Sequence, residues 1–231
     1  MKSTIIVPAY NESERILSFL TELIEYSKKN IKDSEILIVN DGSKDDTAEV
    51  VGKFIKNKKN TKLLSYNKNR GKGGAIQYGI QYAKGDKILF IDADGSIQPD
   101  QIPKMLDALD KNDVVVGDRL SKESKVEKSI IRKITSFGFN IVVSLIFQYS
   151  YRDNLCGFKG FKKNIAKDLF KDLIDKRWVF DVELFYKIKK KKYKLYYLPI
   201  TWKHVEGSQV NVIKDSIVWF MRLLRLRFKL K

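Results

Sequence analysis

The chain has 231 residues, of which 43% are hydrophobic and 32% charged, a size that suits one well-buried domain rather than two. Its 45 Lys and Arg against 28 Asp and Glu give a formal net charge of +17, which indicates an anionic partner such as a nucleic acid, a membrane surface or a phosphorylated substrate. A single cysteine, Cys156, and a single histidine, His204, exclude an intramolecular disulfide and a Cys/His zinc cluster.

The basic charge is concentrated in the C-terminal third of the chain. Residues 151–231 contain 21 Lys or Arg and 8 Asp or Glu, whereas residues 1–150 contain 24 and 20. A surface for the anionic partner is therefore predicted in this third. No secretion signal precedes the first hydrophobic stretch, so the sequence predicts an intracellular chain.

Short apolar runs alternate with helical segments over the first 117 residues. Strands are predicted at 4–7, 35–39, 62–64, 87–91 and 113–116. Helices are predicted at 13–28, 45–55, 73–83 and 99–110. This order predicts an α/β domain with a mostly parallel sheet, whose ligands gather beyond the carboxyl ends of the strands.

From residue 127 onward the pattern changes to longer helices. The apolar segment 134–147 is too short to span a bilayer core of roughly 30 Å, so it is either part of the core or a helix in a membrane interface. Segment 215–231 combines large apolar residues with five basic residues after Phe220 and no acidic one among them. This composition is typical of a helix that rests on anionic lipid, and no transmembrane span is predicted.

The motif FIDADGS carries the strongest chemical signal. Asp92 and Asp94 follow an apolar strand and are two residues apart, so they can share one hard divalent cation and leave coordination positions for a diphosphate. Taken alone, such a triplet is more often a solvated turn. Its position at a strand end favours the metal interpretation.

Two further motifs end the first and second strands. In VNDGSKDDT, Asp41 is free to accept a hydrogen bond from a nucleobase or ribose, because Asp45 and Asp46 suffice to cap the following helix. In VPAYNE, Tyr10 offers a surface for a base and Glu12 a further acceptor. The alternative is a plain strand-to-helix turn beside a half-buried tyrosine.

The motif NKNRGKGGA places Arg70 and Lys72 among glycines just before the third helix. Backbone amides and cationic side chains in this arrangement can bind phosphate oxygens at a helix start. The spacing matches neither a P-loop nor GxGxxG. A flexible loop is the alternative.

In chain order, VPAYNE, VNDGSKDDT, NRGKGGA, FIDADGS and GDRL resemble the family 2 inverting glycosyltransferases, which have a single Rossmann-like nucleotide-diphospho-sugar transferase domain of the GT-A type. Farther on, DNLCGFKGF, RWVFDVELFY and HVEGSQV are similar to the polyprenyl-phosphate sugar transferases, and more to their dolichyl-phosphate glucosyl branch than to their mannosyl branch. The resemblance implies one domain over residues 1–231. Residues 1–120 would bind the nucleotide sugar, and residues 121–231 would face the acceptor and the membrane through C-terminal interfacial helices.

The resemblance also implies roles for single residues. The nucleotide sugar would be bound by Pro8, Ala9, Tyr10, Glu12, Asp41, Gly71, Lys72, Asp92 and Ala93. Asp92 and Asp94 would hold Mg²⁺ or Mn²⁺, and the acceptor phosphate would meet Arg119, Arg132 and Ser136. The catalytic residues would be Asp94, Arg119 and Asp181. Ser96 stands where the mannosyl branch carries a glutamine metal ligand, a departure that leaves a Ser96 contact to metal open.

The predicted reaction is the inverting transfer of a hexose, glucose from UDP-glucose, to a polyprenyl phosphate at the cytoplasmic face of a membrane, by a peripheral or monotopic enzyme. Mannosyl transfer from GDP-mannose is one alternative. Transfer to a sugar hydroxyl of a cell-surface polysaccharide is another, and it would need a carboxylate base, for which Asp181 and Glu183 are the candidates. Nucleic-acid binding would explain the basic third but none of the carboxylate motifs, so no nucleic-acid partner is predicted. A non-catalytic scaffold would require a broken metal motif, whereas both aspartates are present.

Overall fold

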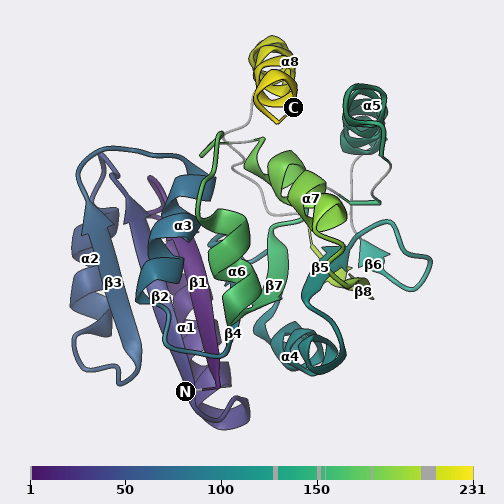
Figure 1. Cartoon of the computed structure of the whole chain (residues 1–231). Coiled ribbons are helices and arrows are strands. Elements are labelled where there is room, and N and C mark those ends of the chain that lie inside the picture. The colour runs from purple at the N-terminus through teal and green to yellow at the C-terminus, as the bar shows by residue number, and fades with distance from the viewer. Residues whose placement is uncertain are drawn as a thin grey trace.

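The computed structural model describes residues 2–126, 130–149, 152–153, 155–177, 179–203 and 212–230, without the side chains of residues 130–137, 139 and 212–217. Within this part, seven strands form one sheet in the spatial order β3-β2-β1-β4-β7-β5-β8 (Figure 1). Their bounds are β1 Ser3–Ala9, β2 Ser34–Asp41, β3 Thr61–Tyr66, β4 Lys87–Ile91, β5 Val114–Asp118, β7 Phe158–Lys162 and β8 Leu195–Pro199. Strand β7 runs antiparallel to both its neighbours, β4 and β5, and the other pairs are parallel. A short parallel pair joins β6 Lys125–Val126 to β9 Thr201–Trp202.

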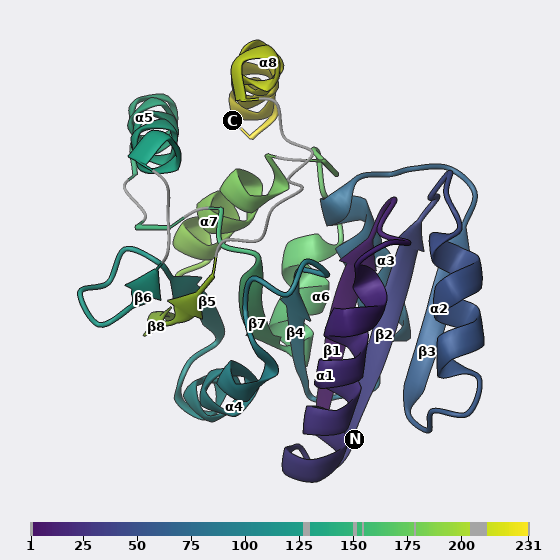
Figure 2. The same ribbon diagram turned by 180° about the vertical axis from the view of Figure 1, so that it is seen from behind.

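Helices cover both faces of this sheet. Their bounds are α1 Ile16–Asn30, α2 Thr47–Ile55, α3 Lys72–Tyr82, the short 3₁₀ helix η1 Pro99–Gln101, α4 Ile102–Lys111, α5 Ile130–Phe147, α6 Lys163–Phe170, α7 Phe180–Lys190 and α8 Val212–Lys229. Helices α1 and α2 lie on one face, and α3 and α6 lie on the other (Figures 1 and 2). This is the layered arrangement that a parallel sheet requires, because its strands are buried on both faces.

The apolar patterns explain why these segments form the core. In β1, Ile5, Ile6 and Val7 are all fully buried, as expected for a strand covered on both sides. In α1 the buried residues Ile16, Phe19, Leu20, Leu23 and Ile24 recur at helical spacing, so one face of the helix packs on the sheet. Each such side chain stabilises the fold by about 1.5–3 kcal/mol relative to an exposed position.

The five strands and four helices predicted in the first 117 residues are confirmed, with boundaries shifted by a few residues. Longer helices do follow residue 127, but the sequence predicts neither β7 nor β8, which complete the sheet. Strand β7 reads FKGFK, and its Lys159 is as deeply buried as its Phe158. A buried lysine breaks the apolar pattern by which a central strand is recognised.

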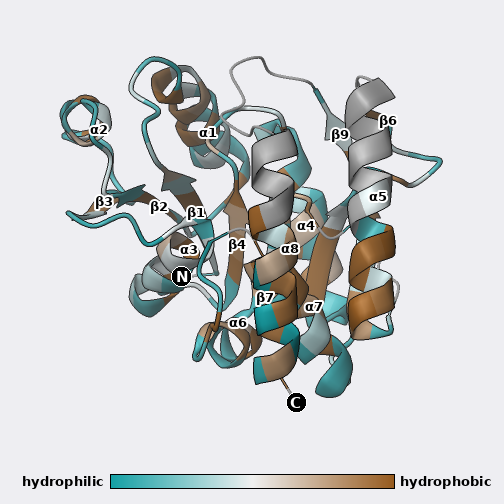
Figure 3. Cartoon of the chain, turned by 90° about the horizontal axis from the view of Figure 1, so that it is seen from above, coloured by the Kyte–Doolittle hydropathy of each residue, from teal (hydrophilic) through white to brown (hydrophobic). Residues whose placement is uncertain are grey.

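Two helices, α5 and α8, lie beyond the end of the sheet to which the parallel strands point (Figure 1). They run side by side, and the Arg227 side chain on α8 donates to the Ile146 carbonyl on α5 at 3.1 Å (Figure 3). Among the described residues, none of the helices combines the length and the hydropathy needed to cross a bilayer. The polar strand ends of β1, β2 and β4 face the same end of the molecule as these two helices.

Candidate active site

The carboxylate of Asp41, at the end of β2, organises the loop before α3. Its Oδ1 accepts hydrogen bonds from the Tyr66 hydroxyl at 2.6 Å and the Arg70 amide at 2.7 Å, and its Oδ2 accepts from the Gly71 amide at 2.8 Å. Burial and this carboxylate raise the pKa of the Tyr66 phenol. Gly71 has φ +85, a backbone conformation that favours glycine. Asp41 thus positions the start of α3 and Gly71, a residue that the sequence analysis assigns to nucleotide-sugar binding.

The loop after β1 is fastened to the loop after β2. The backbone amide of Asn11 donates to the Ser43 hydroxyl at 3.0 Å, and the backbone amide of Glu12 donates to the Thr47 hydroxyl at 2.8 Å. The Glu12 carboxylate forms an ion pair with Arg15. Three other residues predicted to bind the donor form the strand end just before this loop: half-buried Pro8, buried Ala9 and half-buried Tyr10.

Asp45 is the second fastening point between these loops. Its Oδ2 accepts from the Ser13 amide at 3.1 Å, and its Oδ1 accepts from the Thr47 amide at 3.1 Å. Burial raises the pKa of Asp45, but the hydrogen bonds from Thr47 and Ser13 outweigh it and lower the pKa to about 2. The Asp45 carboxylate therefore binds the first amide of α2, whereas Asp46, the residue at the N-cap position, makes no capping hydrogen bond with its side chain.

Lys72 and Asp92 meet between α3 and the end of β4. The Lys72 Nζ lies 2.5 Å from the Asp92 Oδ1, and both side chains remain partly exposed. Burial lowers the pKa of Lys72, but the charges of Asp92, Asp181 and Asp94 outweigh it, so the pKa is raised. Asp94 Oδ1 accepts from the Ser96 amide at 2.9 Å. The structure therefore gathers three predicted site residues, two carboxylates and one ammonium, at one strand end.

Gly157 is a site residue that the sequence reasoning missed. A Cβ at this position would lie 1.8 Å from the Asp92 Oδ2 and 2.4 Å from its Cγ. Only a residue without a side chain leaves the Asp92 carboxylate where it is. Gly157 stands in DNLCGFKGF, a segment singled out by resemblance, but its partner is 65 positions earlier in the sequence.

Asp181 lies under the same cluster, at the start of α7. Its Oδ1 accepts from the Lys159 Nζ at 2.6 Å, and Lys159 also donates to the Cys156 carbonyl at 2.7 Å. Burial raises the pKa of Asp181, and the positive charges of Lys159 and Lys72 only partly offset this effect. Lys159 is a second residue that the sequence reasoning missed, since a lysine in an apolar strand gave no signal of its own.

Glu183 faces away from that cluster. Its carboxylate accepts from the amides of Ile174 and Asp175 at 2.9 and 3.1 Å and pairs with the Lys187 Nζ at 2.6 Å. The side chain has no exposed area. These contacts give Glu183 a structural task, which is to hold the loop before α7. Of the two candidate bases, only Asp181 lies beside Lys72 and Asp92.

Arg119 follows β5 and is bound by Asp153. The guanidinium Nε and Nη2 each donate to the Asp153 carboxylate at 2.7 Å, and the Arg119 amide donates to it at 3.0 Å. Burial alone would lower the pKa of the Arg119 guanidinium, but the Asp153 carboxylate outweighs this effect. The pKa is therefore raised, and the group stays charged. Its Cζ also lies 5.9 Å from the ring centroid of Trp202. The side chains of Arg132 and Ser136, on the first turns of α5, lie outside the described residues.

The carboxylates of Asp92 and Asp94 suit a hard divalent cation such as Mg²⁺ or Mn²⁺. Among the described residues no group of three or more His, Cys, Asp and Glu side chains is arranged to hold a metal. These two aspartates would therefore supply the protein ligands, and a diphosphate and water would complete the shell. A site of this kind fits the residues present, provided that Asp92 exchanges its contact with Lys72.

The chain is similar to a protein family and to several known proteins. The model of the family described as glycosyl transferase family 2 matches residues 4–170. A dolichyl-phosphate beta-glucosyltransferase of Dictyostelium discoideum is 35% identical over 98% of this chain and 74% of its own length. One of Trichomonas vaginalis is 38% identical over 96% of this chain and 71% of its own length. The crystal structure of glucosyl-3-phosphoglycerate synthase from Mycobacterium tuberculosis superposes with a TM-score of 0.72 at 14% identity, covering 99% of this chain and 79% of that one.

Proposed function

Because the chain belongs to glycosyl transferase family 2 and is a glycosyltransferase with the GT-A fold, we propose that it transfers glucose with inversion from UDP-glucose to dolichyl phosphate or a similar polyprenyl phosphate. The relatives named dolichyl-phosphate beta-glucosyltransferase support this choice of sugar and acceptor. The observation that carries it is the cluster of Lys72, Asp92 and Asp94 at the end of β4, which suits a nucleoside diphosphate. The proposed place is the cytoplasmic face of a membrane, with the protein peripheral or monotopic.

The carboxylates near the site favour a phosphate as the acceptor. A phosphate is already anionic at neutral pH, so its oxygen can attack the anomeric carbon without a general base. A sugar hydroxyl would need one. Asp181 is held by Lys159 at 2.6 Å and Glu183 by Lys187 at 2.6 Å. In each case the lysine ammonium occupies a carboxylate oxygen and the carboxylate side chain is buried, so a sugar hydroxyl has little access to either group.

The donor end of the reaction uses the loops at the ends of β1, β2 and β4. Asp92 and Asp94 would hold Mg²⁺ or Mn²⁺, which when bound neutralises the negative charge of the departing nucleoside diphosphate. Lys72 is placed to contact the same diphosphate once it leaves Asp92, since its Nζ already lies at this carboxylate. The loops held by Asp41 and Asp45 would bind the nucleoside through Pro8, Ala9, Tyr10 and Glu12.

The acceptor end is assigned to Arg119, with Arg132 and Ser136 as further contacts. Asp153 holds two of the guanidinium nitrogens of Arg119, so the plane of the group is fixed before the acceptor arrives. A cationic side chain that is already fixed loses less conformational entropy on binding a phosphate than a mobile side chain does. Attack opposite the diphosphate inverts the anomeric centre, so an α-linked donor gives a β-linked lipid phosphate.

The test is a transfer assay with radiolabelled UDP-glucose, Mg²⁺ or Mn²⁺, and dolichyl phosphate in detergent. We expect labelled glucosyl lipid, and we expect Asp94→Asn to lose about 100-fold or more in rate, as when one charge-stabilising group is removed from a site of this kind. Asp107→Asn is the matched control, because Asp107 is an exposed aspartate on α4, outside the loops assigned to the donor. Label in a sugar hydroxyl product but not in the lipid would refute the proposed acceptor. Transfer from GDP-mannose but not UDP-glucose would refute the proposed donor.

A further inference from the structure

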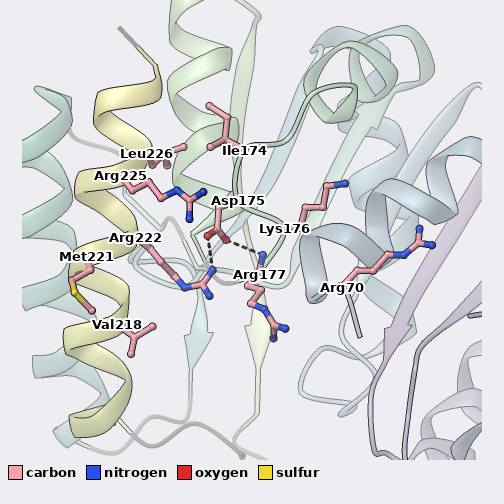
Figure 4. A pocket seen from close by; sticks show the side chains of 10 residues that line it. All are labelled: Arg70, Ile174, Asp175, Lys176, Arg177, Val218, Met221, Arg222, Arg225 and Leu226. Carbon is pink, nitrogen blue, oxygen red and sulfur yellow. Dashed lines mark hydrogen bonds and ion pairs between the residues drawn. The ribbon is translucent and has the colours of Figure 1, made fainter. Parts of the chain in front are cut away.

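A concave surface lies between α8 and the loop of residues 174–177, which joins α6 to α7 (Figure 4). We call this surface the α8 groove. Its volume is about 480 Å³, within the range of sites that hold a small molecule. Neither Asp92 nor Asp94 belongs to the described residues that line it. The α8 groove therefore borders the loop before α3 through Arg70 but does not include the two carboxylates at the end of β4.

The groove has a strong excess of positive charge. Its charged lining residues are Arg70, Asp175, Lys176, Arg177, Arg222 and Arg225. Asp175 accepts from the Arg222 Nη1 at 2.7 Å and so neutralises one of the five cations. The described lining offers no second carboxylate to the other four. Like charges in a concave surface repel one another and focus a positive potential into it, so an anion bound there would be stabilised.

The backbone of the groove loop and the guanidinium of Arg70 are held in place before a ligand arrives. The Gly74 amide donates to the Lys176 carbonyl at 2.9 Å, and the Arg177 amide donates to the Asp175 Oδ1 at 2.8 Å. The guanidinium of Arg70 stacks on Tyr66, with its Cζ 4.3 Å from the ring centroid. A loop fixed in this way loses little conformational entropy on binding. These contacts make the groove a built site rather than a chance gathering of surface charge.

The apolar rim of the groove indicates what kind of anion it takes. Val218 and Met221 line the groove on α8 and are 44% and 59% exposed. On the neighbouring α5, Ile141 and Leu145 are 45% and 77% exposed. Exposed large apolar side chains beside arginines are typical of a helix in a membrane interface. A free phosphate would use the cations alone, whereas a lipid would use both the cations and the rim.

We propose that the α8 groove binds the phosphate headgroup of an anionic membrane lipid, whose acyl chains extend along Val218 and Met221. Arg119, the described residue proposed to meet the acceptor phosphate, does not belong to the lining of the groove. This lipid site goes beyond the transfer reaction, and only its setting at a membrane surface rests on the proposed function. Arg225 is the most direct probe, because it is an exposed arginine of the groove on α8 (Figure 4).

The test is sedimentation of the full chain with vesicles of phosphatidylcholine, with or without phosphatidylglycerol, in the absence of nucleotide sugar and polyprenyl phosphate. We expect phosphatidylglycerol to strengthen binding at least tenfold. Arg225→Glu should remove most of that gain, and Arg225→Gln should remove part of it. Lys229→Glu is the matched control, because Lys229 is an exposed cation on the same helix outside the groove. Lys229→Gln, which removes one positive charge, should lose no more than a few-fold, the effect of one surface charge near anionic lipid, and Lys229→Glu should lose less than Arg225→Glu.

Three outcomes would overturn the inference. Equal losses for Arg225→Glu and Lys229→Glu would show general surface electrostatics. Competition by millimolar inorganic phosphate, with no gain from phosphatidylglycerol, would show a free-phosphate site. Recruitment by dolichyl phosphate in phosphatidylcholine vesicles that needs Arg225, again without a phosphatidylglycerol effect, would assign the groove to the acceptor. Because the readout is vesicle binding without turnover, a failure here is distinct from a failure of the transfer assay.

Discussion

Gly157→Ala tests whether the position of the Asp92 carboxylate controls donor binding. The new Cβ would lie 1.8 Å from the Asp92 Oδ2, whereas an ordinary contact between carbon and oxygen is about 3.3 Å. The carboxylate must therefore move by roughly 1.5 Å, the difference between these distances. A shift of that size also breaks the 2.5 Å contact between Asp92 and Lys72. The backbone and the core around β7 are left as they are.

Displacing a metal-binding carboxylate in this way should weaken cation-dependent donor binding by about 10- to 100-fold, the usual cost of losing a group that orients a ligand. The assay is calorimetric titration of UDP-glucose with Mn²⁺ present, alongside thermal unfolding by circular dichroism. Gly138→Ala is the matched control, because a Cβ there meets nothing within 4 Å. On an exposed helix it should stabilise the protein by about 0.5–1 kcal/mol and leave binding unchanged. Donor affinity equal to the unmodified protein in Gly157→Ala would refute the role given to Asp92.

Three further substitutions separate structural from functional carboxylates. Glu183→Ala should lower the free energy of unfolding by about 3–5 kcal/mol in urea denaturation, because it leaves a buried ion pair broken; unchanged stability would contradict the structural role. Asp153→Asn should raise the KM for polyprenyl phosphate about tenfold or more by freeing Arg119, at an unchanged KM for UDP-glucose. Asp45→Asn should cost about 1 kcal/mol at pH 7. Because the folded pKa of Asp45 is about 2 and its unfolded pKa about 3.9, that difference should persist above pH 4 and vanish as the pH falls through 2; a constant difference would refute it.

The sequence predicts the parts of the site in which each residue stands next to a strand end. Asp41 is the last residue of β2, and Asp92 directly follows β4. A parallel sheet therefore brings both residues to one edge, whatever the details of packing. Lys72 opens the helix that follows β3, and its meeting with Asp92 follows from the same topology. These contacts depend on local pattern plus the rule for strand order.

The contacts that the sequence does not predict depend on β7. This strand enters between β4 and β5 in the opposite direction, and it brings Gly157 against Asp92 and Lys159 against Asp181. Both pairs join residues far apart in the chain, and neither glycine nor a buried lysine has a periodic signal. The same limit applies to Asp153, which binds Arg119 across 34 positions.

Two of the three neighbouring aspartates of the site are each paired with a lysine. Lys72 pairs with Asp92 and Lys159 with Asp181, so neither carboxylate is an isolated buried charge, which would be costly. In the proposed reaction the diphosphate of UDP-glucose arrives with two negative charges and a divalent cation with two positive ones. Asp92 and Asp94 would hold such a cation, which would neutralise charge on the diphosphate, and Lys72 would then be free to contact the diphosphate itself. The total charge of the site would stay constant, and the Lys72 ammonium would lie where negative charge grows as the nucleoside diphosphate departs.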